Sequence, residues 1–365
     1  MRETIIGFFP KMDTESAVLY QTGAPLKIRN LKIPPLQKAQ VLVKILSTGI
    51  CHSQLNEINA TKGKDKYLPH TLGHEASGIV IDTGDLVTKV KKGDYVVASW
   101  IRGLGLEATP PRYIDSNKTI INSGAITTFL EYAIISENCL ISISKKVNPN
   151  VAALFGCALP TGGGIILNQL RKKKGKSLAI FGIGGIGSSA LLVASSLNTF
   201  SEIIAIDIKE DKLKKAITLG AKKTINASKE DPIKRIKELT GGIGVDYAIE
   251  TAGSKKAMED AFNSLKEGNF GRGGGLLVIA GNIPNDQRIE IYPFDLIRGK
   301  KIIGSWGGNS NIDKDIPIYE KMYLSGQLPL ERLITNTFSL REINTALDFL
   351  SEGKCLRSII EINKI

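Results

Sequence analysis

The spacing of hydrophobic residues changes near residue 150. Before that point, short β-rich runs such as AVLY and VLVKIL are separated by Gly, Pro and Gln, and no long stretch has a helical period. Such runs are typical of a compact, mainly antiparallel domain. After Gly164, apolar runs alternate with helix-like segments, which predicts a parallel, doubly wound sheet. The fold class is therefore α/β, and 365 residues suit two domains.

The second half of the chain resolves into a series of expected elements. Strands are expected near 178–182, 203–207, 223–225, 245–251, 276–281 and 301–306, and helices near 210–219, 232–239, 255–265, 313–324 and 340–351. We expect the last two helices to return the chain to the first domain. The predicted domains are residues 1–160 with 306–365, and residues 161–305.

One glycine motif organises this second half. The apolar run 178–181 leads into Gly182, Gly184 and Gly187, and a second apolar run ends at Asp207. Gly182 allows the turn, Gly184 allows a pyrophosphate to approach the backbone, and Gly187 lets the helix lie close to its strand. The N–H groups at the helix start then face the phosphates. Asp207 would accept hydrogen bonds from the adenosine ribose, which favours NAD over NADP.

Composition limits the other classes of function. The net charge of +12 suggests nucleic acid, but the lysines are scattered, and the one dense basic run, 171–176, has no interleaved aromatic residues. We therefore expect no nucleic-acid partner. No apolar run approaches the roughly twenty residues of a membrane span, and no signal peptide is evident. Four cysteines without a CxxC pair suggest reduced thiols and a cytoplasmic protein.

Two cysteines and one histidine lie in short segments that interrupt the strand pattern or follow it. Cys51 lies in GICHS, His74 in GHEASGIV and Cys157 in GCALPTGGG. Two thiolates and one imidazole form a ligand set of the catalytic zinc type, with a fourth position open for water or substrate. Sequence spacing does not give their geometry, and a single cysteine is most often a small buried hydrophobic residue.

These segments resemble the zinc-dependent alcohol dehydrogenases of the medium-chain dehydrogenase/reductase family, from about Ser16 to the C-terminus. The resemblance implies a GroES-like, mainly antiparallel catalytic domain and a Rossmann-type cofactor domain. It implies one catalytic Zn²⁺ per chain, held by Cys51, His74 and Cys157, and NAD as the second cofactor. It also implies an oxidoreductase that interconverts a small alcohol and an aldehyde or ketone, with hydride transfer to or from NAD(H).

The same resemblance assigns roles to further residues. It implies catalytic roles for Ser53, Glu75 and Asn56, with Ser53 as a proton relay and Glu75 as an acid behind the metal. Trp100 matches a position in the substrate pocket. Cofactor contacts are implied for His52, Thr161, Gly182, Gly184, Gly185, Ile186, Gly187, Asp207, Lys212 and Arg357.

The chain also departs from the family pattern. The family usually has a lobe with four closely spaced cysteines that bind a structural zinc, but here GDYVVAS leads into residues 100–124 with no cysteine. We expect packing and prolines to hold this loop. Asn56, which cannot titrate, stands where a relay histidine is frequent, so the proton is expected to leave to water or through His52. Gln54 stands where the family frequently has Asp.

Several alternatives remain at this stage. A zinc-free reductase of the same superfamily, using NADPH on enones or quinones, would lack the ligand set, and a polyol dehydrogenase would more often carry Glu in place of Cys157. A binding protein that had lost turnover is a further class. Relatives pair their cofactor sheets edge to edge, so the resemblance implies a homodimer or homotetramer with a seam near 301–305.

Overall fold

The structure is a computed structural model that describes residues 12–61, 63–170 and 175–364. Its contacts divide the chain into two compact units. The first runs to Ala153 and includes Thr337–Asp348 and the chain from Ile359, and the second comprises Leu154–Asn336 and Phe349–Ser358. This division assigns residues 306–336 to the second unit, whereas the predicted domain boundary placed them in the first domain. Residues 1–11 and the basic residues 171–174 lie outside the described residues.

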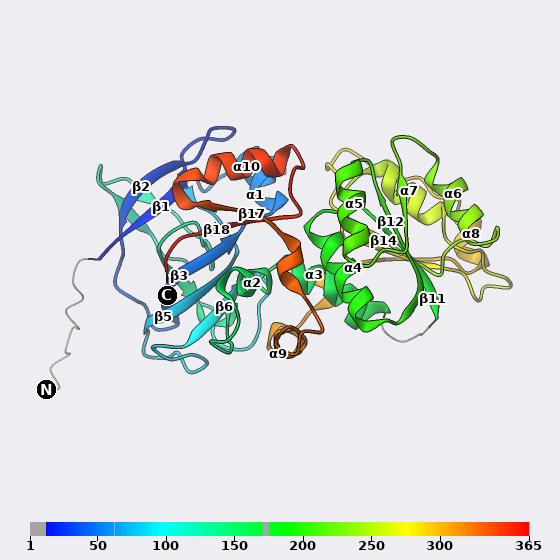
Figure 1. The fold of residues 1–365 in the computed structure, drawn as a ribbon. Helices are drawn as coiled ribbons and strands as arrows, with labels where there is room; N and C mark the ends of the chain where they lie inside the picture. The colour runs from blue at the N-terminus through cyan, green and yellow to red at the C-terminus, as the bar shows by residue number, and fades with distance from the viewer. Residues whose placement is uncertain (1–11, 62, 171–174, 365) are drawn as a thin grey trace, which may run out of the picture. The chain divides into compact units, whose positions relative to one another are not determined.

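The first unit is built mainly from two sheets (Figure 1). One has five strands in the order β4 (His70–Thr71), β1 (Asp13–Leu19), β2 (Lys27–Lys32), β7 (Tyr113–Asp115) and β8 (Ile120–Ile121). The other has the order β10 (Leu140–Ser142), β6 (Tyr95–Ser99), β5 (Glu75–Thr83), β3 (Gln40–Gly49), β18 (Arg357–Glu361) and β17 (Ile334–Ser339), with β9 (Tyr132–Ser136) also paired to β3.

Both sheets follow from the alternation of apolar residues in the first half of the chain. Neighbouring strands such as β1 and β2, β3 and β5, and β5 and β6 pair antiparallel, as the sequence predicted. Val18 and Leu31 from one sheet share a buried core with Val43 and Ile45 from the other. Alternate residues of each strand therefore close one hydrophobic core.

The second unit contains a six-stranded parallel sheet. Its order is β13 (Lys223–Asn226), β12 (Phe200–Asp207), β11 (Lys176–Phe181), β14 (Tyr247–Glu250), β15 (Leu276–Ile279) and β16 (Lys301–Gly304), and every neighbouring pair is parallel. The central strands β11 and β12 are apolar on both faces because helices cover them. This confirms the predicted doubly wound sheet.

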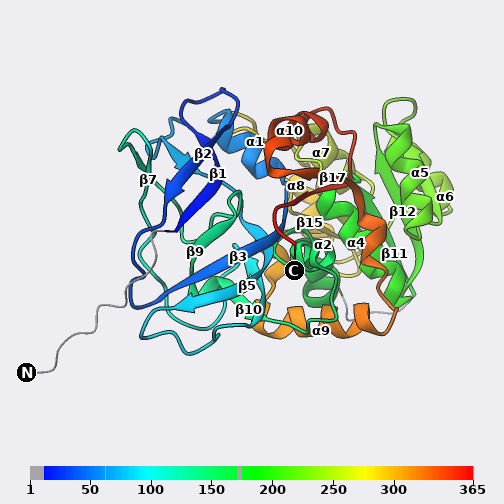
Figure 2. The ribbon, with the colours of Figure 1, turned by 60° about the vertical axis from the view of Figure 1, so that its left-hand side comes forward.

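Helices surround this sheet, as Figure 2 also shows. Those that pack against its strands are α4 (Gly185–Leu197), α5 (Glu210–Thr218), α6 (Pro232–Leu239) and α7 (Lys255–Asn263). The second unit also contains α3 (Ala158–Gly164), α8 (Pro293–Arg298) and α9 (Ile312–Leu324), and α3 packs against α4 and α9. The boundaries of α6 match the prediction because Asp231 caps its N-terminus and Pro232 is its first residue. Among the described residues, no helix combines the length and hydropathy that a membrane span requires.

Four short helices lie outside the predicted set, one of them α3 with seven residues. The other three are α1 (His52–Ile58), α2 (Pro149–Leu154) and α8, with seven, six and six residues. The sequence shows no long stretch of helical period before residue 150, and α1 is not evident there because seven residues are too few to show one. The helix α10 (Ile343–Ser351) starts slightly after its predicted start, following a short 3₁₀ turn at Leu340–Glu342.

A buried carboxylate holds the cysteine-free loop that follows β6. The side chain of Glu137 accepts hydrogen bonds from the N–H groups of Thr88 (2.6 Å), Lys89 (2.6 Å) and Leu106 (2.7 Å). Burial alone would raise the pKa of this carboxyl, but these donors and the nearby Lys89 charge hold the pKa below its usual value. The sequence predicted packing and prolines and missed this hydrogen bonding.

We expect Glu137→Gln to destabilise the protein by about 2 kcal/mol, because the amide nitrogen cannot accept one of these backbone hydrogen bonds. The contribution of Glu137 is present above the unfolded pKa and is lost as pH falls through the lowered folded value. The difference between the variant and the parent, measured by denaturant unfolding, should therefore shrink in acid. Amide hydrogen exchange at Leu106 should also accelerate.

The control is Glu107→Gln in the same loop, since the Glu107 side chain is 61% exposed and pairs with Arg102. Exposed ion pairs contribute little to stability. Equal losses of stability in the two variants at neutral pH would contradict this role of Glu137.

Candidate metal and cofactor sites

The pairing of two strands places Cys51 and His74. Strand β3 ends at Gly49, two residues before Cys51, and β5 begins at Glu75, directly after His74. These strands are antiparallel neighbours, with Thr48 opposite Ala76, so the end of one strand lies beside the start of the other. Gly73 allows this approach, because its φ is +94° and a Cβ there would lie 2.3 Å from Oγ1 of Thr128.

Cys157 completes the cluster from the start of α3, where it is the N-cap residue. One possible ligand atom from each of Cys51, His74 and Cys157 lies within 4.8 Å of the others, and no second group of this kind occurs among the described residues. Cys157 is buried, while Cys51 and His74 are partly accessible. The three residues proposed from sequence context therefore come together in space.

The donor set fits zinc. Two cysteine sulfurs and one histidine nitrogen are the ligand types that zinc prefers, and three protein ligands are typical of a catalytic site with an open position. Calcium and magnesium prefer oxygen ligands and do not suit these residues.

Gln54 joins two of the ligand segments, which the sequence did not predict. Its side chain is almost fully buried. Its Oε1 accepts a hydrogen bond from the N–H of Cys51 (2.9 Å), and its amide nitrogen contacts Nδ1 of His74. The amide thus fixes the orientation of the imidazole relative to the Cys51 backbone, as partners behind metal ligands commonly do.

The expected relay residues lie on the short helix α1. His52 and Ser53 are exposed and Asn56 is half-buried. Ser53 and Asn56 are three residues apart and therefore share one face of the helix. Cys51 is the N-cap residue of the same helix, so these side chains directly follow a metal-ligand candidate.

Glu75 and Trp100 are placed by the pairing of β5 and β6. Glu75 is fully buried at the start of β5 and lies opposite Ser99 in the antiparallel register. Its carbonyl accepts a hydrogen bond from Thr48 (2.7 Å). Trp100 directly follows β6, so the same register carries it toward His74.

The glycine motif forms a tight strand–turn–helix connection between β11 and α4. Gly182 has a φ of +90°, and a Cβ on Gly187 would lie 1.9 Å from the carbonyl oxygen of Gly182. A Cβ on Gly184 would meet no atom within 4 Å. The helix therefore packs directly on the turn, while space remains beside Gly184. Gly185 and Ile186 form the first residues of α4.

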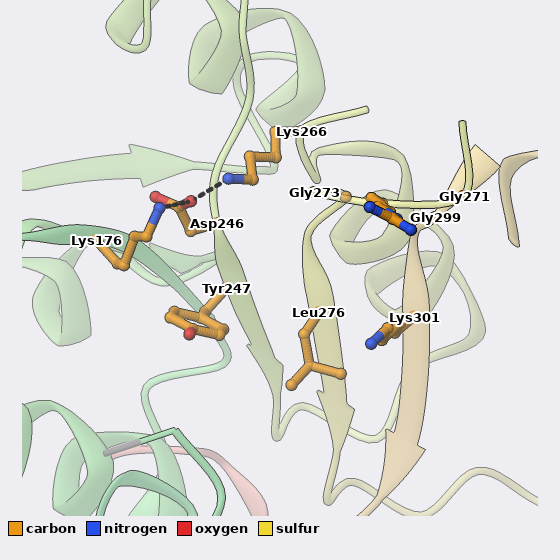
Figure 3. A pocket seen from close by; sticks show the side chains of 11 residues that line it. Lys176, Asp246, Tyr247, Lys266, Gly271, Gly273, Leu276, Gly299 and Lys301 are labelled. Carbon is orange, nitrogen blue, oxygen red and sulfur yellow. Dashed lines mark hydrogen bonds and ion pairs between the residues drawn. The ribbon is translucent and has the colours of Figure 1, made fainter. Parts of the chain in front are cut away.

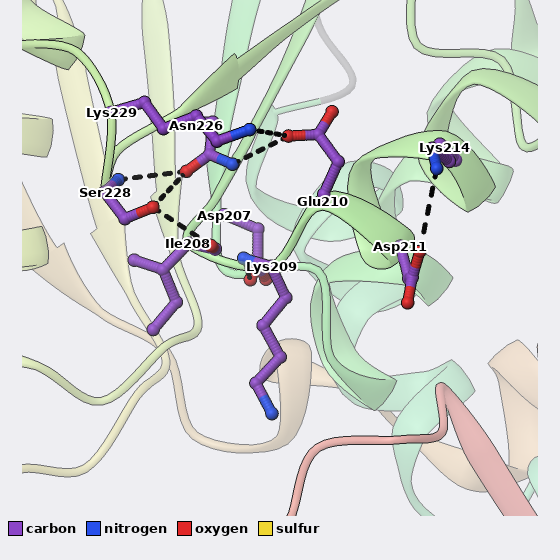
Figure 4. A network of polar contacts seen from close by, with 9 residues as sticks. All are labelled: Asp207, Ile208, Lys209, Glu210, Asp211, Lys214, Asn226, Ser228 and Lys229. Atoms are coloured by element: carbon purple, nitrogen blue, oxygen red, sulfur yellow. Dashed lines mark hydrogen bonds and ion pairs between the residues drawn. The ribbon is translucent and has the colours of Figure 1, made fainter.

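Asp207 ends β12 beside this turn. Its carboxylate accepts hydrogen bonds from the N–H groups of Ile183 (2.7 Å) and Lys209 (2.9 Å). Close by, Glu210 contacts Asn226 and Lys229, as Figure 4 shows. The carboxylate thus lies where the glycine turn and the following loop meet.

Three other predicted cofactor residues occupy the same unit. The side chain of the buried Arg357 lies against Gly185 at the start of α4, because a Cβ on Gly185 would approach it to 3.0 Å. The hydroxyl of Thr161 donates a hydrogen bond to the carbonyl of Cys157 (2.8 Å). Lys212 lies in α5 after Asp207.

Glu250 is a buried residue beside the cofactor turn that the sequence did not single out. It ends β14, and its carboxylate accepts a hydrogen bond from the N–H of Gly253 (2.7 Å). Burial raises its pKa to about 7, against hydrogen bonds from neighbouring backbone N–H groups. Because the folded pKa is raised, this group favours the folded state at low pH, and that contribution is lost as pH rises through about 7.

Comparisons with known families agree with this geometry. The model of the alcohol dehydrogenase GroES-like domain matches residues 37–145, and that of zinc-binding dehydrogenases matches residues 185–321. Alcohol dehydrogenase 2 of Zea mays is 31% identical, and the alignment covers 95% of this chain and 97% of that protein. The chain belongs to the zinc-binding alcohol dehydrogenase family.

Other relatives support this assignment. An S-(hydroxymethyl)glutathione dehydrogenase of Synechocystis sp. is 30% identical over 96% of this chain and the whole of that protein. The benzyl alcohol dehydrogenase structure from Acinetobacter calcoaceticus has a TM-score of 0.86 at 30% identity, covering 96% of this chain and all of that chain. This alcohol dehydrogenase therefore has a GroES-like unit and a Rossmann-type unit, and it is an oxidoreductase.

We expect Gln54→Glu to strengthen zinc binding by this dehydrogenase. A glutamate has nearly the same shape, and its two oxygens can accept hydrogen bonds from both the Cys51 N–H and a protonated Nδ1 of His74. Gln54→Leu removes both interactions and should weaken binding by about tenfold or more. Competition with a chromogenic chelator measures both affinities.

Gln37→Glu, at an exposed position in the first unit, is the control for the added charge. It should leave zinc affinity unchanged. Unchanged affinity in both Gln54 variants would show that Gln54 does not position the ligands.

Proposed function

We propose that this enzyme interconverts a primary alcohol and an aldehyde with NAD as the hydride carrier, at a zinc site formed by Cys51, His74 and Cys157. The observation that carries the proposal is the convergence of these ligand atoms within 4.8 Å. A zinc-free reductase would have no use for this cluster. The fully buried Glu75 next to His74 would be the acid behind the metal.

The metal-site residues would leave a fourth position open for the substrate oxygen. Bound zinc supplies Lewis acidity, which lowers the pKa of an alcohol hydroxyl by several units. Cys51 and His74 are partly accessible, whereas Cys157 is buried. We infer that substrate approaches from the side of Cys51 and His74.

The contacts of Asp207 support NAD as the cofactor. NAD supplies the hydride acceptor in this reaction class. The Asp207 carboxylate lies at the end of β12 beside Ile183, where the adenosine ribose of a dinucleotide would bind, and it would repel a 2′-phosphate. Arg357 lies beside the start of α4 and would contact the pyrophosphate, as would His52. Thr161 would lie near the nicotinamide and Lys212 near the ribose.

The residues of α1 would carry the proton. The Ser53 hydroxyl would take the proton of the alcohol and pass it on, since a hydroxyl both donates and accepts. Asn56 shares its helix face with Ser53 but cannot take up a proton, because its amide does not titrate in this range. We infer that the proton leaves through water or through His52, which is exposed one residue before Ser53.

The substrate and the assembly are also proposals. Trp100 directly follows β6 and favours a flat substrate, and the benzyl alcohol dehydrogenase that resembles this chain makes an aromatic primary alcohol the first compound to test. Strand β16 is an edge strand of the parallel sheet, which suits pairing with a second copy in a homodimer or homotetramer. We place the enzyme in the cytoplasm because its cysteine spacing does not suggest a disulfide framework.

The parent enzyme should reduce NAD with benzyl alcohol and should bind NADH more tightly than NADPH. Asp207→Ser should reduce this preference by about tenfold or more, because it removes the charge that repels the 2′-phosphate. Fluorescence titration of NADH and NADPH measures the preference, and absorbance at the NADH band measures turnover.

Asp211→Ser is the matched control, because the Asp211 side chain is 91% exposed on α5. An unchanged cofactor preference in Asp207→Ser would contradict the role of Asp207. Failure of the parent to oxidise benzyl, allylic or aliphatic alcohols with either cofactor would contradict the proposed reaction.

A further inference from the structure

A second cavity lies at the edge of the parallel sheet opposite the glycine turn. Strands β11, β14, β15 and β16 begin at Lys176, Tyr247, Leu276 and Lys301, and these four residues line a cavity of about 410 Å³. Figure 3 shows the residues around it. We call it the basal pocket. Because the strands are parallel, it lies at the end of the sheet away from Gly182 and Asp207.

One wall of the basal pocket carries two lysines held by one carboxylate. Asp246 pairs with Lys176 at 3.0 Å and with Lys266 at 2.5 Å (Figure 3). Its carboxylate also accepts a hydrogen bond from the N–H of Ser177 (3.0 Å). Burial opposes ionisation, but these donors lower the pKa of Asp246 to about 2. Asp246 thus holds the ammonium groups of Lys176 and Lys266 at the pocket. Each ammonium group has further N–H donors that do not bind Asp246.

The other wall adds two cations. Arg272 and Lys301 both line the pocket and are exposed in the single chain, and Lys301 is also the first residue of β16, the strand proposed to pair with a second copy. No ion pair joins either side chain to an acid in the described part of the chain. With Lys176 and Lys266 they make four cations around the single acid Asp246. Three positive charges therefore remain uncompensated within one cavity.

The loop that carries Arg272 also presents backbone donors. Gly271 and Gly273 have φ angles of +72° and +75°, and a Cβ on Gly273 would meet no atom within 4 Å. Within residues 175–364, the N–H groups of Gly271, Gly273 and Gly274 donate no hydrogen bond. Phe270 and Gly271 are both left-handed and form the tip of a turn that is closed by hydrogen bonds between Asn269 and Arg272. Successive backbone N–H groups in a turn can form a concave anion site.

We propose that the basal pocket binds a small phosphate-bearing anion, through Arg272, Lys301, Lys266 and the N–H groups of the 271–274 loop. A phosphate offers oxygens in several directions, which suits donors from two walls and a guanidinium that can bind in a bidentate manner. Ordinary ion pairs between surface lysines and Asp246 would not account for the open N–H groups of the glycine loop beside them. This site is separate from the proposed zinc and NAD sites and does not depend on them.

Calorimetric titration with inorganic pyrophosphate at low ionic strength tests the proposal. Saturating NADH is present throughout to occupy the proposed cofactor site, so that pyrophosphate binding there does not contribute to the measured heat. The parent should bind pyrophosphate, and Arg272→Ala/Lys301→Ala should bind it at least tenfold more weakly, since a charge-assisted pair is the stronger kind of hydrogen bond. Gly273→Ala should also weaken binding, although it changes no charge.

The control is Lys223→Ala/Arg288→Ala, which removes the same charges at exposed positions of the second unit outside the pocket. It should bind pyrophosphate as the parent does. Equal weakening in both double variants would reduce the effect to general charge and overturn the proposal. So would the absence of binding by the parent, or tighter binding of citrate than of pyrophosphate, which would assign the pocket to carboxylates.

Discussion

The antiparallel pairing of β3 with β5 is the constraint on which the metal site depends. It brings the end of one strand beside the start of the other, and the residues just outside this pairing are Cys51 and His74. A one-residue slip in register would move every side chain of a strand to the other face of the sheet. Gly73 and Gln54 reinforce the arrangement, the first by permitting close packing against Thr128 and the second by joining the Cys51 backbone to His74.

In the second unit, the parallel sheet positions the cofactor-site residues. A parallel sheet directs the ends of its strands to one edge, and there the glycine turn leaves backbone N–H groups and space for a dinucleotide. Asp207 is held at that edge by backbone donors from Ile183 and Lys209. Glu250 holds the neighbouring turn by accepting the Gly253 N–H. The opposite edge, with its lysines and its glycine loop, has a charge pattern that dinucleotide binding does not explain.

The sequence predicted what depends on residue type and period. Alternation of apolar residues predicted the antiparallel first half, and the alternating strands and helices predicted the parallel sheet. The glycine spacing and Asp207 predicted the turn and its carboxylate. Motif context, rather than spacing, grouped Cys51, His74 and Cys157 in the interpretation, because Cys157 lies more than eighty positions from the other two and the sequence carries no local signal of their proximity.

The features missed by the sequence depend on tertiary contacts. Glu137 holds a loop by accepting hydrogen bonds from backbone N–H groups in two separate segments. The sequence next to Glu137 gives no indication of these donors. Gln54 was noticed only as a substitution, and its contact with His74 requires the packed α1 helix. The helices α1 and α8 are too short for a periodic pattern, so tertiary packing determines them rather than propensity.

The most direct test of this account is the zinc content of the purified protein, measured by elemental analysis without chelators at any step. We predict about one zinc per chain, lost in Cys157→Ala and retained in Cys355→Ala, where another buried cysteine outside the cluster is removed. A parent protein with no zinc after reconstitution, or a Cys157→Ala variant that keeps it, would contradict the account.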